Sequence, residues 1–215
     1  LTIRDDKVDE VSREDQEFMI LESRFLEKPA FAVEQGRNAA KHMEQDSRKI
    51  LDIALGLIHS YSDEQAERVQ KLESKIDRYE DELGTYLVKL NNKDLSERDS
   101  HSVSIMLHCI GDFERISDHA VNIMESAQEL HEKNISFSPQ AKNELQVLIA
   151  VVSRIVDTAY QVFDKQDLNL TRDVEPLEEI VDELSKELKR RHVNRLRSGE
   201  CTIEMGFILT DLLTS

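Results

Sequence analysis

An internal repeat of a helical pattern constrains this chain more than any other feature. Residues 72–83, LESKIDRYEDEL, and residues 177–188, LEEIVDELSKEL, carry Leu, Glu, Asp, Glu and Leu at the same offsets, about half a chain length apart. Heptads of Leu and Glu match easily by chance, but the clearest internal loop, residues 133–139 (KNISFSP), lies between the two segments. We therefore expect two copies of one helical unit.

Apolar periodicity and helix-end signals predict six long helices with short connections. Six Gly and three Pro disfavour many tight turns, and with them most all-β folds. Asp94 with Glu97 is expected to cap the third helix, and Ser138 with Pro139 to start the fourth. The expected helices are residues 29–60, 62–90, 94–131, 138–165, 168 or 174 to 197, and 201 to the end of the chain.

The expected fold class is all-α, with two repeated three-helix bundles. Residues 1–28 are charged and weakly periodic and are expected to form a linker segment, followed by a first repeat at 29–133 and a second at 138–215. The sixth helix is cut off at Ser215, so the second repeat is expected to lack the end of its third helix. The chain opens on Leu1, and we expect it to be a piece of a longer protein.

Charge and composition exclude several classes of function. The chain has 44 acidic and 28 basic side chains, a formal net charge of −16, which disfavours binding to nucleic acid or anionic lipid. Cys109 and Cys201, without a CxxC pattern, are typical of small core residues in a reducing compartment. No run of about 18 apolar residues occurs, so no membrane-spanning helix is expected. The basic run 186–197 indicates a solvated helix end, with anionic lipid or a membrane partner as the alternative.

Pairs of carboxylates four residues apart recur on the expected helices. A pair repels itself by a few tenths of a kcal/mol, whereas hard metal ions bind several carboxylate oxygens at once. In so acidic a chain an isolated pair is typical of a solvated surface, but pairs at repeat-related positions keep a metal site open. The three pairs are Glu73 and Asp77, Glu114 and Asp118, and Glu178 and Asp182, with Asn122 as a candidate outer ligand. We expect Glu114 and Asp118 to face Glu73 and Asp77 across neighbouring helices of the first repeat.

Other chemistry is not indicated by the sequence. None of the seven histidines has a Glu three residues before it, so the Glu-x-x-His pattern of di-iron bundles is missing. Glycine-rich phosphate loops and nucleophile elbows are also missing. His108 and His119 are expected to be packed or surface residues, not ligands. No catalytic residue is predicted.

The segment DFERISDHAVNI, residues 112–123, resembles the repeated helical motif of the PhoU family of phosphate-uptake regulators. The positions that match the motif are Glu114, Arg115, Ile116, Ser117, Asp118, His119, Asn122 and Ile123. The helix-two pattern of that family is similar to the other two acidic pairs, and the resemblance covers about residues 30–215. It implies an all-α regulatory domain, not an enzyme, with metal held by ExxxD motifs. The family's second Glu-Arg-Ile-x-Asp motif is expected just beyond Ser215.

A second resemblance concerns residues 21–37, LESRFLEKPAFAVEQGR. This segment is similar to the linker between the membrane part and the PhoU-like tail of bacterial sodium/phosphate cotransporters. The matching residues are Leu21, Arg24, Leu26, Pro29, Ala30, Ala32 and Gln35. The resemblance implies a regulatory domain on the cytoplasmic side of the bacterial inner membrane, attached to a sodium:phosphate symporter domain in the same polypeptide. It implies no nucleic-acid partner and leaves a homodimer open.

Four interpretations follow from these patterns. The first is a cytoplasmic domain of a sodium-dependent phosphate transporter that binds iron, zinc, manganese or magnesium. The second is a free-standing PhoU-type regulator of phosphate uptake signalling. A metal-dependent hydrolase is the third, disfavoured by the missing histidine ligands, and an interaction scaffold without metal is the fourth. In either PhoU-like case the two repeats should superpose, with Glu73 over Glu178 and Asp77 over Asp182.

Overall fold

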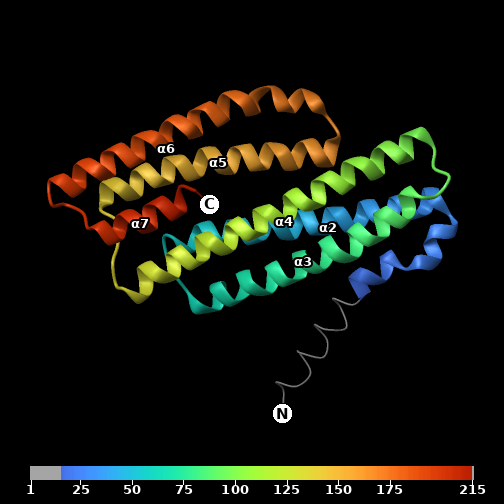
Figure 1. Ribbon diagram of the computed structural model, residues 1–215, viewed down its shortest axis with the longest axis horizontal. Coiled ribbons are helices and arrows are strands. Elements are labelled where there is room, and N and C mark those ends of the chain that lie inside the picture. Colours follow the sequence, from blue (N-terminus) through green and yellow to red (C-terminus); the bar gives the residue numbers. More distant parts are fainter. Residues whose placement is uncertain (1–15, 215) are drawn as a thin grey trace, which may run out of the picture. The chain divides into compact units, whose positions relative to one another are not determined.

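The computed structural model describes residues 16–214 of the chain, and the expectation for residues 1–15 lies outside this part. Long α-helices dominate (Figure 1), and the described residues contain no β-strand. The elements are the 3-10 helices η1 (Met19–Leu21), η2 (Ser23–Glu27) and η3 (Leu168–Asp173), and the α-helices α2 (Pro29–Leu57), α3 (Asp63–Asn91), α4 (Glu97–Glu132), α5 (Pro139–Lys165), α6 (Val174–Arg197) and α7 (Ile203–Leu212). The all-α fold class is confirmed, and within residues 16–214 the six α-helices correspond to the six expected ones, although α7 is only ten residues long.

Two helices begin at a serine that caps the first turn, and one of these caps differs from the expected residue. Ser138 caps α5 as expected, because its side chain accepts a hydrogen bond from the Ala141 backbone N–H. At α4 the expected cap was Asp94, but the Ser96 hydroxyl oxygen accepts from the Asp99 backbone N–H at 3.2 Å. The reason is distance along the chain: α4 begins at Glu97, so Ser96, not Asp94, stands at the capping position.

The described part of the chain divides into two compact units. The first contains residues 16–52 and 68–118, and the second contains residues 53–67 and 119–214. The boundary between these units falls inside α2, α3 and α4, and the division into repeats at 29–133 and 138–215 stays a prediction. Ile58 and Leu130 account for this boundary, because both pack into the apolar core formed by the second half of the chain. Superposition of the two repeats stays a prediction.

The first unit is held by an apolar core with a few buried polar links. Its largest fully buried side chains include Tyr79, Met43, Ile50, Ile76, Leu83 and Leu87. The Ser47 hydroxyl on α2 donates to the Phe113 carbonyl oxygen on α4 at 3.1 Å. The Tyr86 hydroxyl on α3 donates to the Ala32 carbonyl oxygen on α2 at 3.3 Å. These bonds satisfy polar atoms that would otherwise be buried without a partner.

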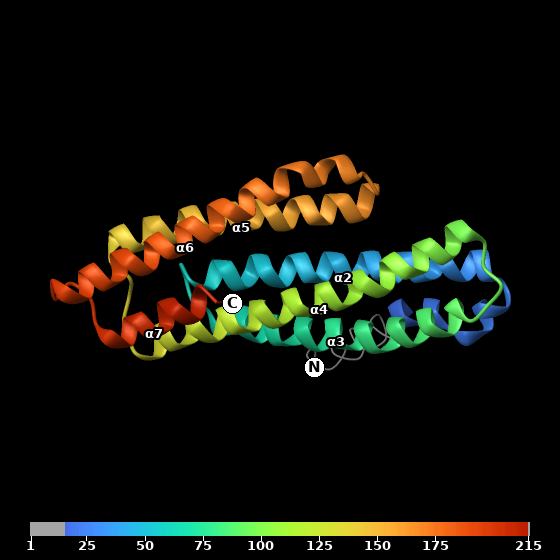
Figure 2. The same ribbon diagram turned by 45° about the horizontal axis from the view of Figure 1, so that its top comes forward.

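The second unit is built around the hairpin of α5 and α6. The two helices run side by side in opposite directions, with η3 at the turn between them and α7 packed against α6 (Figure 2). Repeat positions are buried alike: Leu72 and Leu177 are 8% and 9% exposed, and Leu83 and Leu188 are 0% and 3%. The apolar members of the internal repeat therefore serve the core in both halves, which supports its structural origin.

By length and composition alone, helix α5 is long and apolar enough to cross a membrane. Of its most apolar 18-residue stretch, 17% is buried. The sequence expectation of no membrane-spanning segment rested on uninterrupted apolar runs, and Arg154 and Asp157 interrupt this one. A single helix of this kind is weak evidence for a membrane span, because the criterion tests length and composition alone. The helix packs against α6 and η3.

Gly206 on α7 marks a close approach to α6. A Cβ at this position would lie 2.6 Å from His192 Nε2. We expect Gly206→Ala to lower the free energy of unfolding by about 1–2 kcal/mol, because the methyl group overpacks a buried ring. The control is Gly111→Ala on α4, where nothing lies within 4 Å of the added Cβ. That variant should gain about 0.5–1 kcal/mol of helix stability. Urea unfolding of both variants measures the difference, and equal effects would contradict the contact.

Candidate functional site

Four of the predicted acidic residues gather in the first unit, on two helices. Glu73 and Asp77 lie on α3, and Glu114 and Asp118 lie on α4. Burial, then repulsion from Asp77 and from Asp118, raises the pKa of Glu73 above its ordinary value. Burial, then repulsion from Asp118, Glu80 and Asp77, raises the pKa of Glu114. The charges on α3 and α4 therefore repel one another. We call the two predicted pairs, Glu73 with Asp77 and Glu114 with Asp118, the acidic cluster.

The acidic cluster has the donor chemistry of a cation site but not a closed geometry. Glu73 and Glu114 are half-buried, and Asp77 and Asp118 are exposed. Among the side chains that the structure describes, no group of three or more His, Cys, Asp or Glu residues is arranged to hold a metal ion. Binding would require these side chains to turn toward one another, which their exposure permits. Carboxylate oxygens in that arrangement suit hard divalent ions.

The remaining predicted residues lie elsewhere. Glu178 and Asp182 are exposed on α6, in the second unit. Asn122 is exposed on α4 and lines a cavity of about 340 Å³ within the second unit, together with Glu125 and Asp211. Metal binding at any of these residues stays a prediction. As expected, His108 is on the surface, while His119 is half-buried, with a buried Nδ1 that makes no hydrogen bond.

A neighbouring ion network in the first unit was missed by the sequence reasoning. Lys75 Nζ lies 2.6 Å from Glu17 Oε2 and 2.8 Å from Asp46 Oδ2. The Tyr79 hydroxyl donates to Glu17 at 3.0 Å. Burial opposes the charge of Lys75, but hydrogen bonds and ion pairs with Asp46 and Glu17 outweigh it and raise the Lys75 pKa. One signal in the sequence could have revealed this network. Lys75 lies between Glu73 and Asp77, and a helix turns it to the side of α3 opposite these two acids.

The acidic cluster has a pH signature that can be measured at Glu114. Its folded-state pKa is raised above the ordinary value of 4.5, so the charged form destabilises the fold. This destabilisation is present at neutral pH and is lost as the pH falls through the raised pKa. We expect Glu114→Gln to be more stable than wild type at pH 7, by about a few tenths of a kcal/mol because the site is solvent-screened. The gain should shrink as the pH falls toward the ordinary pKa of 4.5 and vanish below it. Urea unfolding across this pH range tests the sign, and no gain at pH 7 would contradict mutual repulsion.

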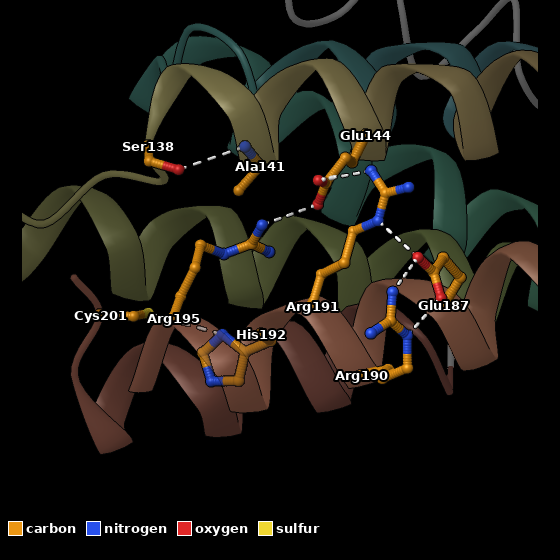
Figure 3. A network of polar contacts seen from close by, with 9 residues as sticks. All are labelled: Ser138, Ala141, Glu144, Glu187, Arg190, Arg191, His192, Arg195 and Cys201. Carbon is orange, nitrogen blue, oxygen red and sulfur yellow. Dashed lines mark hydrogen bonds and ion pairs between the residues drawn. The ribbon is translucent and has the colours of Figure 1, made fainter. Parts of the chain in front are cut away.

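A second polar network lies in the second unit (Figure 3). Glu144 on α5 accepts from Arg195 and from Arg191 of α6, each at 3.0 Å. The side chains of Glu144 and Arg195 are 9% and 10% exposed, so this ion pair is largely withdrawn from water. Glu187 pairs with Arg190 and Arg191 nearer the surface. The network joins the two helices of the hairpin, and its form indicates a structural role.

The two cysteines agree with the sequence expectation in part. Cys109 and Cys201 are free thiols and are half-buried, and Cys201 packs against the apolar core of the second unit. Cys201 follows a turn and precedes α7, where α6 and α7 leave it partly open. Its sulfur lies 3.5 Å from His192 Nδ1. Spacing along the chain did not suggest this pair, because the two residues are nine positions apart and the turn between two helices separates them.

Comparisons with known proteins agree with this architecture. A family model described as the PhoU domain matches residues 40–127 and 145–214. The chain is 29% identical over 97 residues to "Phosphate-specific transport system accessory protein PhoU homolog 1" of Thermotoga maritima, a match that covers 45% of this chain and 41% of that protein. The crystal structure of PhoU from Pseudomonas aeruginosa is similar with a TM-score of 0.77 and 21% identity, covering 85% of this chain and 87% of that one. Because the family model matches most of its residues, the chain belongs to the PhoU domain family.

Proposed function

We propose that this chain is a regulator of phosphate uptake of the PhoU type, acting through protein contacts and not as an enzyme. The observation that carries the proposal is the family match over residues 40–127 and 145–214, which spans both halves of the chain. The relative from Thermotoga maritima bears the name of an accessory protein of a phosphate-specific transport system. The free-standing form of regulator is the version that these relatives favour.

We also propose that the acidic cluster takes a divalent cation as part of this function. Glu73 and Asp77 would approach the ion from α3, and Glu114 and Asp118 from α4. Support comes from the raised pKa values of Glu73 and Glu114, which report like charges facing one another across two helices. A cation supplies the positive charge that offsets this repulsion and ties α3 to α4. Such an ion would stiffen the first unit without any reaction.

A complementation experiment tests the regulatory proposal. A bacterial strain that lacks its own PhoU protein is supplied with this chain, and uptake of labelled phosphate is measured in phosphate-rich and phosphate-poor medium. We expect the chain to restore the dependence of uptake on external phosphate. A matched variant, Glu114→Ala with Asp118→Ala, should restore it less well if the acidic cluster contributes. Uptake that stays the same with and without the chain would contradict the proposal.

A second candidate is a regulatory domain joined to a sodium/phosphate cotransporter. The observation that favours it is the way the segment before α2 packs on the first unit. Phe18 lies 4.4 Å from the Tyr79 ring, centroid to centroid, and Glu17 pairs with Lys75 at 2.6 Å. Such docking would pass a movement of a preceding domain to α3. Reading the gene upstream of Leu1 decides between the candidates, because several encoded hydrophobic helices are expected only for the cotransporter.

A further inference from the structure

Cys201 and His192 form a pair at the junction of α6 and α7. The thiol sulfur lies 3.5 Å from His192 Nδ1 and 3.7 Å from the carbonyl oxygen of Thr202. Cys201 is half-buried, whereas His192 is 7% exposed. Figure 3 shows the imidazole ring beside Cys201, with Arg195 on the same helix. The Cys201 sulfur, a potential nucleophile, therefore contacts a buried base. The pair lies outside the acidic cluster, and the proposed function does not use it.

One nitrogen of the His192 imidazole is available to accept a proton. Burial, and then the Arg195 guanidinium, lowers the pKa of His192 below its ordinary value, so the ring is neutral near pH 7. Its Nε2 is buried without a hydrogen-bond partner and faces Gly206, where an added Cβ would be 2.6 Å away. With the proton on Nε2, Nδ1 is the acceptor. That acceptor faces the thiol.

The surroundings of Cys201 resemble those of reactive cysteines. The pair lines a cavity of about 200 Å³, together with Phe137, Thr202 and Met205. Thr202 is the N-cap of the ten-residue helix α7, so the sulfur also lies at a helix N-terminus, which carries partial positive charge. A basic partner, partial exposure and a helix N-terminus are together typical of modifiable thiols. Burial and the charge of Asp112 raise the pKa of the Cys109 thiol, which makes Cys109 the less reactive comparison.

We propose that Cys201 is a thiol-modification site, at which a small hydroperoxide that enters this cavity oxidises the thiol to a sulfenic acid, with His192 as the proton acceptor. The sulfur attacks one peroxide oxygen, so an S–O bond forms while the O–O bond breaks. The thiol proton passes to His192 Nδ1 and then to the departing oxygen, which leaves as water or an alcohol. Sulfur is oxidised and the peroxide is reduced.

Oxidation at this position would act on α7. Met205 and Leu209 line the same cavity and anchor α7 in the core of the second unit. A polar oxygen placed against these apolar side chains weakens their packing. The oxidised protein should therefore have a lower thermal midpoint than the reduced protein.

The wild-type chain provides its own control, because it contains two thiols. The folded protein is given a brief pulse of hydrogen peroxide at pH 7, sulfenic acid is trapped with dimedone, and the two cysteine peptides are quantified by mass spectrometry. We expect Cys201 to be oxidised roughly tenfold faster than Cys109. It should also react faster in the folded protein than in urea, where both thiols are alike. Equal rates at the two cysteines, or a Cys201 rate that rises in urea, would overturn the proposal.

Variants test whether Cys201 reacts because His192 accepts its proton or only because the thiol is exposed. His192→Asn should slow oxidation of Cys201 by roughly tenfold or more through loss of the proton acceptor, and Cys201→Ser should abolish labelling of that peptide. His108→Asn, at an exposed histidine of α4, is the matched control and should change nothing. Circular dichroism establishes that each variant is folded. An unchanged Cys201 rate in a folded His192→Asn protein would overturn the role of His192. If that variant unfolds, the wild-type comparison between folded protein and urea decides.

Discussion

Glu144→Gln is expected to lower the free energy of unfolding by about 3 kcal/mol, the largest single-residue effect proposed for this chain. The Arg195 guanidinium that Glu144 accepts from is 10% exposed, and without the carboxylate it would remain buried with its charge uncompensated. Gln keeps the shape of Glu, so the loss reports charge and hydrogen bonding and not a cavity. Urea unfolding measures the change.

Two controls sharpen this prediction. Glu187→Gln removes a carboxylate from the same network, where Arg190 and Arg191 are 63% and 43% exposed, and its effect should be much smaller. The double variant Glu144→Leu with Arg195→Met should recover most of the lost stability, because it removes both charges from the interior. A Glu144→Gln protein as stable as wild type would show that water, and not Glu144, balances the charge of Arg195.

A divalent cation is expected to stabilise the wild-type chain by about 2.7 kcal/mol at a free concentration one hundred times its Kd. The physical reason is that the proposed ion would bind the folded acidic cluster, where Glu73, Asp77, Glu114 and Asp118 repel one another, and not the unfolded chain. Thermal melts with iron, zinc, manganese or magnesium, each against a chelator, measure the shift of the midpoint.

Two double variants that each remove two carboxylates show where the cation binds. The variant Glu114→Ala with Asp118→Ala should lose the shift, because it removes the α4 half of the cluster. The variant Glu178→Ala with Asp182→Ala makes the same change in net charge at exposed positions of α6 and should respond like wild type. If no cation raises the wild-type midpoint, or if both variants respond like wild type, the acidic pairs are solvated surface.

Much of the site could be predicted from the sequence because it depends on helical spacing. The pairs Glu73 with Asp77 and Glu114 with Asp118 were expected to share a helix face, and they lie on α3 and α4 as predicted. The sequence also led to the hypothesis that the two pairs face one another across neighbouring helices, and the repulsion of Glu73 by Asp118 and of Glu114 by Asp77 supports it. The contribution of Glu80 to Glu114 depends on the packing of the two helices. Glu80 was not predicted, since its own helix pattern does not distinguish it from other surface acids.

Sequence alone determined the helices, their order and the repeat, because apolar period, caps and breakers act over a few neighbouring residues. Tertiary structure decided which distant residues meet. Glu144 and Arg195 are 51 positions apart, Glu17 and Tyr79 are 62 apart, and Cys201 meets His192 across a turn. Those contacts depend on how the helices pack against one another, which helical period does not specify. The same reason explains why the compact units divide α2, α3 and α4 instead of following the loop between the repeats.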